Sequence, residues 1–133
     1  MGDLTKTGID KILNSYKREG FKNFVKGTTV IKIAHHGRVN GCSSELFDLI
    51  GNKPLVGIVS DETLNESNSG TSNVGWYDSY ISDNKVKING ELQARKVLTT
   101  RKDKDIFMEF FPDGTFEVHT DCFSTDKESI LNS

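Results

Sequence analysis

Residues 30–37 read Val-Ile-Lys-Ile-Ala-His-His-Gly, an apolar run that ends abruptly in two histidines and a glycine. Its β-branched residues predict a short strand over Val30–Ala34. Imidazole is the commonest metal-binding side chain, and in α/β folds ligands and catalytic groups gather beyond the carboxyl ends of strands. The pair His35-His36 therefore marks a candidate site. The alternative is a turn in which both histidines hydrogen-bond to the backbone.

The segments on either side of this strand predict alternating helices and strands. Upstream, a helix is expected to begin at Thr7 and to end near Gly20. Its apolar residues recur at helical spacing and are Ile9, Ile12, Leu13 and Tyr16. Downstream, residues 43–50 predict a second helix, and the apolar run at 55–60 predicts a buried strand. This succession favours an α/β fold.

The second half of the chain predicts loops and short strands. Residues 61–75 are rich in Asn, Ser, Gly and Glu and predict a long polar loop, a type of segment that often forms a lid or a binding loop. Short strands are expected around 86–88 and 97–100. The runs 106–111 and 115–120 flank a Pro-Asp-Gly turn, which is a strong hairpin signal. We expect one domain over 1–122 and a polar tail over 123–133.

The composition describes a globular chain without a strong electrostatic preference. The chain has 133 residues and a formal net charge of −2, which gives no overall attraction to nucleic acid. No apolar run is long enough to span a bilayer, and the N-terminus does not have the pattern of a signal peptide. The two cysteines, Cys42 and Cys122, are expected to be free thiols in a reducing compartment. We therefore predict a cytoplasmic protein without a membrane segment.

Several further segments place the His-His-Gly motif in a family context. A small polar turn and the helix start Cys42-Ser43-Ser44 follow the motif, and Gly2-Asp3-Leu4 opens the chain well upstream of it. A Pro-led strand at 54–60, a Val-Leu-Thr-Thr segment at 97–100 and the Asp-Gly hairpin come after it. In this order, the segments resemble the metallo-β-lactamase-fold hydrolases related to the DNA-uptake competence protein. The resemblance extends from Gly2 to about Cys122.

The resemblance implies both a fold and a chemistry. The fold would be the C-terminal half of a four-layer αββα metallo-β-lactamase domain, with one mixed sheet, flanking helices and a C-terminal β-hairpin. In the complete parent, two divalent cations, zinc or in some members manganese, activate a shared hydroxide. By position in the family's motifs, Asp3 is a metal ligand, and His36 matches the last metal ligand better than His35 does. His35 is then the catalytic candidate that faces the substrate, or it supports the metal ligands from behind. The implied substrate of the parent is a phosphodiester or a nucleic acid.

The histidine cluster that holds most of both metals in this superfamily, His-x-His-x-Asp-His, does not occur in this sequence. The chain has three histidines, and the third, His119, is expected to be structural or solvent-facing in a hairpin strand. Two protein ligands are fewer than the three or four of a tight zinc site. We therefore expect that this chain alone binds no metal tightly and is inactive. We also expect Met1 to be an internal start or the point of a truncation.

A half-fold is also expected to self-associate. The complete domain packs two sheets face to face, so that a lone half would bare one apolar face. The candidates for this face are Ile31, Ile33, Val56, Ile58, Met108 and Phe110. We predict a homo-oligomer, or assembly with the missing N-terminal half. Two alternatives are a non-catalytic binding or oligomerisation module on the same half-fold, and an unrelated α/β domain with a chance His-His-Gly.

Overall fold

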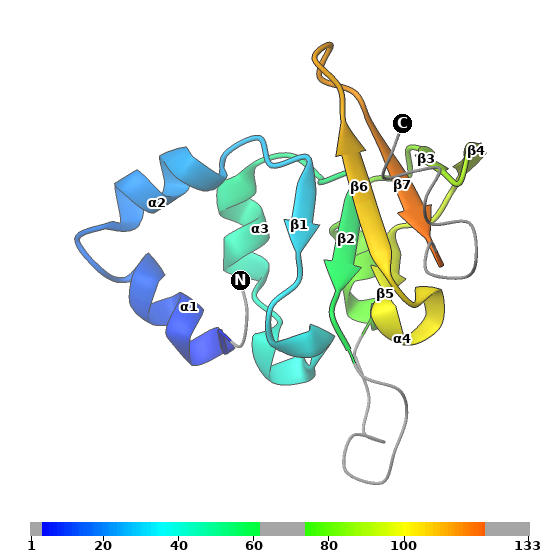
Figure 1. Cartoon of the computed structure of the whole chain (residues 1–133). Coiled ribbons are helices and arrows are strands. Elements are labelled where there is room, and N and C mark those ends of the chain that lie inside the picture. Colours follow the sequence, from blue (N-terminus) through cyan, green and yellow to red (C-terminus); the bar gives the residue numbers. More distant parts are fainter. Residues whose placement is uncertain (1–3, 62–73, 122–133) are drawn as a thin grey trace, which may run out of the picture.

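Two short helices, α1 (Lys6–Leu13) and α2 (Arg18–Val25), open the chain in the computed structural model, which describes residues 4–61 and 74–121 (Figure 1). The predicted cap at Thr7 is wrong, because the side chain of Thr5 accepts the hydrogen bond from the Gly8 amide at 3.3 Å. The predicted single helix is also wrong. It is interrupted after Leu13, well before Gly20.

Polar side chains explain why the first helix ends early. Asn14 Nδ2 and Ser15 Oγ donate hydrogen bonds to the carbonyls of Asp10 and Ile12, at 2.9 and 2.7 Å. Such local bonds compete with the helical ladder of the main chain. Tyr16 therefore lies in a turn with 93% of its surface exposed, not on the buried face of a helix.

The predicted strands on either side of the His-His-Gly motif pair in one parallel sheet. This sheet contains β1 (Val30–Lys32), β2 (Val56–Val59) and β5 (Val97–Thr99) in the order β1-β2-β5. Between β1 and β2 lies α3 (Ser44–Ile50), whose N-terminus is capped by Ser43 Oγ at 3.3 Å from the Leu46 amide. The left-handed Gly51 ends α3. The helix predicted at 43–50 and the strand predicted at 55–60 are thereby confirmed, and β1 is shorter than predicted.

The remaining strands form a mixed sheet in the order β4-β3-β7-β6. Its strands are β3 (Val86–Ile88), β4 (Glu91–Gln93), β6 (Ile106–Phe110) and β7 (Phe116–Thr120). The predicted hairpin is confirmed: β6 and β7 pair antiparallel around a turn in which Gly114 has φ 86°. Strand β4 and the short helix α4 (Thr100–Asp103) were not predicted.

The α/β class is confirmed, but the prediction of one mixed sheet is wrong, because the described residues form two sheets, one parallel and one mixed. Both faces of the parallel sheet are covered. On one face, Ile31, Ile33 and Val59 belong to a core with α1, α3 and the 3₁₀ segment η3 (Val74–Ser79). On the other face, Val56 and Leu98 belong to a core with strands of the mixed sheet. The layers are therefore helices, parallel sheet and mixed sheet (Figure 1).

The apolar residues predicted to form a bare face divide between the two covered faces of the parallel sheet. Ile31 and Ile33 are buried in the core with the helices, Val56 is buried in the core with the mixed sheet, and Ile58 and Met108 are partly buried against that second core. Of the six candidates only Phe110, with 66% of its surface exposed, remains open to solvent. The chain therefore covers most of this surface itself. The homo-oligomer remains a prediction.

Aromatic side chains pack beside the first core. The rings of Trp76, Tyr77 and Tyr80 pack around Phe47. Burial raises the pKa of the Tyr77 hydroxyl, next to Cys42. None of the helices in the described ranges combines the length and the hydropathy that a bilayer crossing requires. Most of the loop 61–75 and the tail 123–133 lie outside the described residues.

Candidate functional site

The carboxyl ends of the three parallel strands gather the polar residues of a candidate site. In Figure 1, the arrowheads of β1 and β2 point to the same edge of the sheet. Beyond β1 lies the segment η1 (His35–Gly37), beyond β2 come Ser60 and Asp61, and α4 follows β5 directly. We call His36, Arg38, Asp61, Thr100 and Arg101 the edge cluster. Ligand sites in open parallel sheets form at this edge.

His36 has an unusual backbone and a fixed ring. Its φ and ψ are 53° and 28°, a left-handed conformation that costs a non-glycine residue about 1–2 kcal/mol. Nδ1 lies 2.6 Å from the carbonyl oxygen of Ser60, at the end of the neighbouring strand. Because a carbonyl only accepts, Nδ1 carries the proton of this bond. In the neutral ring, Nε2 is then the nitrogen with the lone pair.

Asp61 is the buried centre of the edge cluster. Its side chain is only 3% exposed, and Arg101 Nη2 lies 2.7 Å from Oδ2. Arg38 Nη2 lies 3.8 Å from Oδ1, on the other side of the carboxylate. Thr100 Oγ1 accepts a hydrogen bond from the Asp61 amide at 2.8 Å and donates one to its carbonyl at 2.7 Å. Asp61 therefore ties β1, β2 and α4 together beyond the ends of the strands.

The trio of Arg38, Asp61 and Arg101 offers hydrogen-bond donors that suit anions. Two guanidinium groups approach one carboxylate. The side chains of Arg38 and Arg101 retain 27% and 17% of their exposure, so part of each still reaches solvent. A guanidinium presents five N–H donors in a planar fork that matches carboxylate and phosphate oxygens. The cluster can therefore hold an oxyanion next to the fixed imidazole of His36.

The three predicted site residues have different outcomes. His36 lies at the predicted edge. Asp3 lies outside the described residues, and for His35 the side chain lies outside the described part of the structure. His119 is on β7, in the mixed sheet, with Nε2 3.4 Å from Glu109 Oε2 and a ring next to that of Phe107. The structure thus places His119 in the other sheet, away from the strand that leads to His36.

Sequence reasoning missed Arg38, Asp61, Thr100 and Arg101. A signal for two of them was present, because Asp61 comes directly after the predicted strand 55–60 and Thr100 is the last residue of the predicted strand 97–100. Such positions gather ligand-binding groups in α/β folds. No local pattern indicates that the two arginines share one carboxylate.

The described residues do not fit the two-metal centre implied by the resemblance. Across 4–61 and 74–121, no three His, Cys, Asp or Glu side chains come together as a metal-binding group. The carboxylate of Asp61 is engaged by Arg101, and His36 fits the role of a single ligand. No protein-family model, curated protein or solved structure matches the chain.

Proposed function

We propose that this chain is the C-terminal half of a metal-dependent hydrolase with the four-layer metallo-β-lactamase fold. The substrate of the complete enzyme would be a phosphodiester or a nucleic-acid-like molecule. The layer order of helices, parallel sheet and mixed sheet supports half of an αββα arrangement. The remaining metal ligands would come from a segment with the His-rich cluster.

The conformation of His36 carries this proposal. Strained backbone positions cluster at functional sites, where the surrounding structure holds them in place. Metal-ligating histidines typically donate one ring N–H to a carbonyl or carboxylate, which leaves the other nitrogen oriented toward the metal. His36 has both properties, a left-handed backbone and a 2.6 Å contact from Nδ1 to the Ser60 carbonyl.

Each residue has a defined part in the proposal. His36, through Nε2, and Asp3 would hold the metal, and His35 would contact the substrate. Arg38 and Arg101, fixed on Asp61, bind phosphate oxygens of the substrate. A bound divalent cation would supply the activated hydroxide. Because this chain has few of the ligands, its own affinity for the metal is expected to be weak.

Paramagnetic manganese tests the role of His36 in the full chain. Nuclear magnetic resonance spectra are recorded while Mn²⁺ is added at micromolar to millimolar concentration. We expect the amide signals of His36, Ser60 and Asp61 to broaden first. His36→Asn keeps a residue that tolerates the left-handed conformation but removes the imidazole, and should abolish the broadening.

His119→Asn is the matched control, because it removes the histidine of the mixed sheet. The early broadening at the edge cluster should persist in this variant. If the signals around His119 broaden first, or if His36→Asn broadens as the parent chain does, His36 is not a metal ligand. The chain is then better explained as a non-catalytic binding module.

A further inference from the structure

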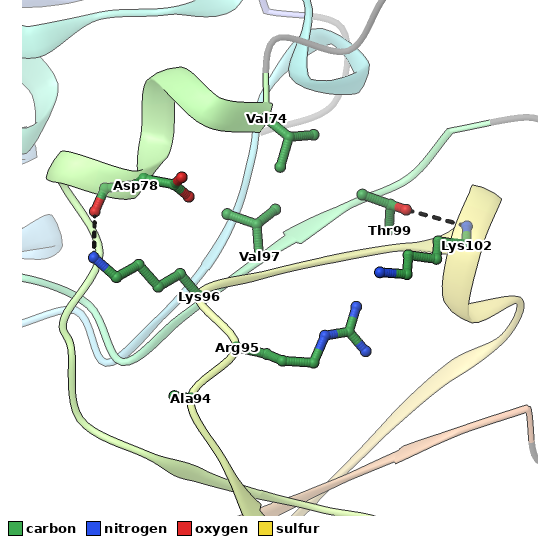
Figure 2. A pocket seen from close by; sticks show the side chains of 8 residues that line it. All are labelled: Val74, Asp78, Ala94, Arg95, Lys96, Val97, Thr99 and Lys102. Atoms are coloured by element: carbon green, nitrogen blue, oxygen red, sulfur yellow. Dashed lines mark hydrogen bonds between the residues drawn. The ribbon is translucent and has the colours of Figure 1, made fainter.

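A second polar site lies beside β5 and shares no residue with the edge cluster. It is a pocket of about 510 Å³ lined by residues of β5, the segment before it, α4 and η3. Figure 2 shows its lining side chains, which are Val74, Asp78, Ala94, Arg95, Lys96, Val97, Thr99 and Lys102. This volume lies within the range of pockets for small molecules, about 300–1,000 Å³.

The cationic groups of the pocket are held in place by different contacts. Arg95 makes a bidentate pair with Asp103, with Nη1 2.6 Å from Oδ1 and Nη2 2.9 Å from Oδ2. The amide of Thr99 donates to the same carboxylate at 3.0 Å. Asp103 thus fixes the guanidinium with two of its five donors, and three N–H groups remain for other partners.

Lys96 is held on the opposite side of the pocket. Its Nζ donates to the Asp78 carbonyl at 2.7 Å and lies 2.6 Å from Asp83 Oδ1. The bond to the Asp78 carbonyl holds this ammonium next to η3, as Figure 2 shows. Lys96 therefore forms a wall of the pocket, with its charge balanced by Asp83.

Lys102 is the third cationic residue of the pocket wall. Its backbone N–H donates to Thr99 Oγ1 at 3.1 Å, which leaves the Thr99 hydroxyl proton available to another acceptor. Its ammonium interacts electrostatically with the Asp103 carboxylate but, among the described residues, forms no ion pair within 4.0 Å. In Figure 2 this ammonium and the Arg95 guanidinium lie on the same side of the pocket, beside Thr99. Together they present N–H and O–H donors, whereas the carboxylate of Asp78 lines the pocket on the side of Lys96.

We propose that this pocket binds a small organic phosphate, whose phosphate group lies between Lys102 and Arg95 and accepts a hydrogen bond from Thr99. The aliphatic side chains of Val74, Ala94 and Val97 line the same space. They favour a phosphate that carries an organic group over the free inorganic ion. The size of the pocket accommodates a ligand as large as a mononucleotide.

Calorimetric titration of the full chain with adenosine monophosphate, adenosine and inorganic phosphate tests this proposal. We expect the monophosphate to bind, adenosine to bind at least tenfold more weakly, and inorganic phosphate to bind more weakly than the monophosphate. Lys102→Gln should weaken the binding of the monophosphate by about tenfold, which corresponds to about 1.4 kcal/mol. Lys11→Gln, the same change on the exposed face of α1, should leave it unchanged.

Ala94→Glu provides a second variant that tests the same site without removing a contact. Ala94 is exposed on the pocket wall, so the new carboxylate should repel the phosphate and leave the melting temperature close to that of the parent chain. The proposal is refuted if the monophosphate does not bind at millimolar concentration. It is also refuted if folded Lys102→Gln and Ala94→Glu both bind it as the parent chain does.

Discussion

Replacing Asp103 by asparagine removes the charge that holds Arg95 and the turn from β5 into α4. The carboxylate side chain is 7% exposed and accepts three hydrogen bonds, two from Arg95 and one from the Thr99 amide. Asparagine offers one acceptor oxygen and turns an N–H₂ group toward other donors. At least one bond is lost, and those that remain lose their charge assistance.

The size of the effect follows from the burial of the pair. Breaking a fully buried ion pair costs about 3–5 kcal/mol. Arg95 retains 28% of its side-chain exposure and can turn to water, which reduces this cost. We expect Asp103→Asn to lower the free energy of unfolding by about 2–3 kcal/mol. At about 4 °C per kcal/mol for a chain of this size, the melting temperature should fall by about 8–12 °C.

The effect should depend on pH in a defined direction. Burial alone raises the pKa of Asp103, but the hydrogen bonds from Arg95 and Thr99 outweigh it and hold this pKa below its ordinary value. The contribution of a carboxylate with a lowered pKa is present above the unfolded pKa of about 3.9 and is lost as the pH falls through the folded pKa. The difference between the parent chain and Asp103→Asn should therefore be full at pH 7 and shrink below about pH 4.

Urea denaturation followed by the fluorescence of the single tryptophan, Trp76, measures both quantities. Glu117→Gln is the control, because its partner Lys87 is 50% exposed and such pairs contribute about 0–1 kcal/mol. A loss below about 0.5 kcal/mol for Asp103→Asn, or one that is the same at pH 7 and pH 3, would contradict the role given to this carboxylate.

Three further predictions concern the parallel sheet and its edge. Gly57→Ala should lower the free energy of unfolding, measured by urea denaturation, by about 1–2 kcal/mol, because a Cβ there would lie 2.8 Å from the buried Ile33 Cδ1. Gly75→Ala is the control, because its Cβ would meet open space and should leave this free energy nearly unchanged. Thr100→Val should lower the free energy of unfolding by about 1–3 kcal/mol and accelerate hydrogen exchange at the Asp61 amide. Both effects follow because the Asp61 amide and carbonyl lose the Thr100 hydroxyl as their hydrogen-bond partner. His36→Gly relieves the left-handed strain as it loses the ring contact, so its unfolding free energy should exceed that of His36→Ala by about 1 kcal/mol.

The elements that the sequence predicted correctly have strong local signals. Ser43 before an apolar helical run is a helix start that needs no distant partner, and Gly114 permits the turn between β6 and β7. The apolar run of β2 is explained by burial on both faces of a parallel sheet. The prediction of one long first helix was wrong for an equally local reason, because the side chains of Asn14 and Ser15 hydrogen-bond to the preceding turn.

The second sheet could not be predicted from local patterns. Its strands β3 and β7 pair through Ile88 and Val118, two residues far apart in the sequence. The alternation of β3 is compatible with a place in either sheet. The choice depends on which strands Val56 and Leu98 pack against, and this is decided by the whole chain.

The residues of the candidate site also differ in how far local sequence indicates them. The sequence singles out His36 because a histidine after a strand is informative by residue type and position alone. Asp61 is buried, and a carboxylate is rarely buried unless it is paired, so its presence requires cations from elsewhere. Those cations are Arg38 and Arg101, which follow two different strands and meet at Asp61 only when β1, β2 and β5 are parallel neighbours. The electrostatics of the edge cluster therefore follow from the order of the strands, and they change if any one of the three strands is displaced.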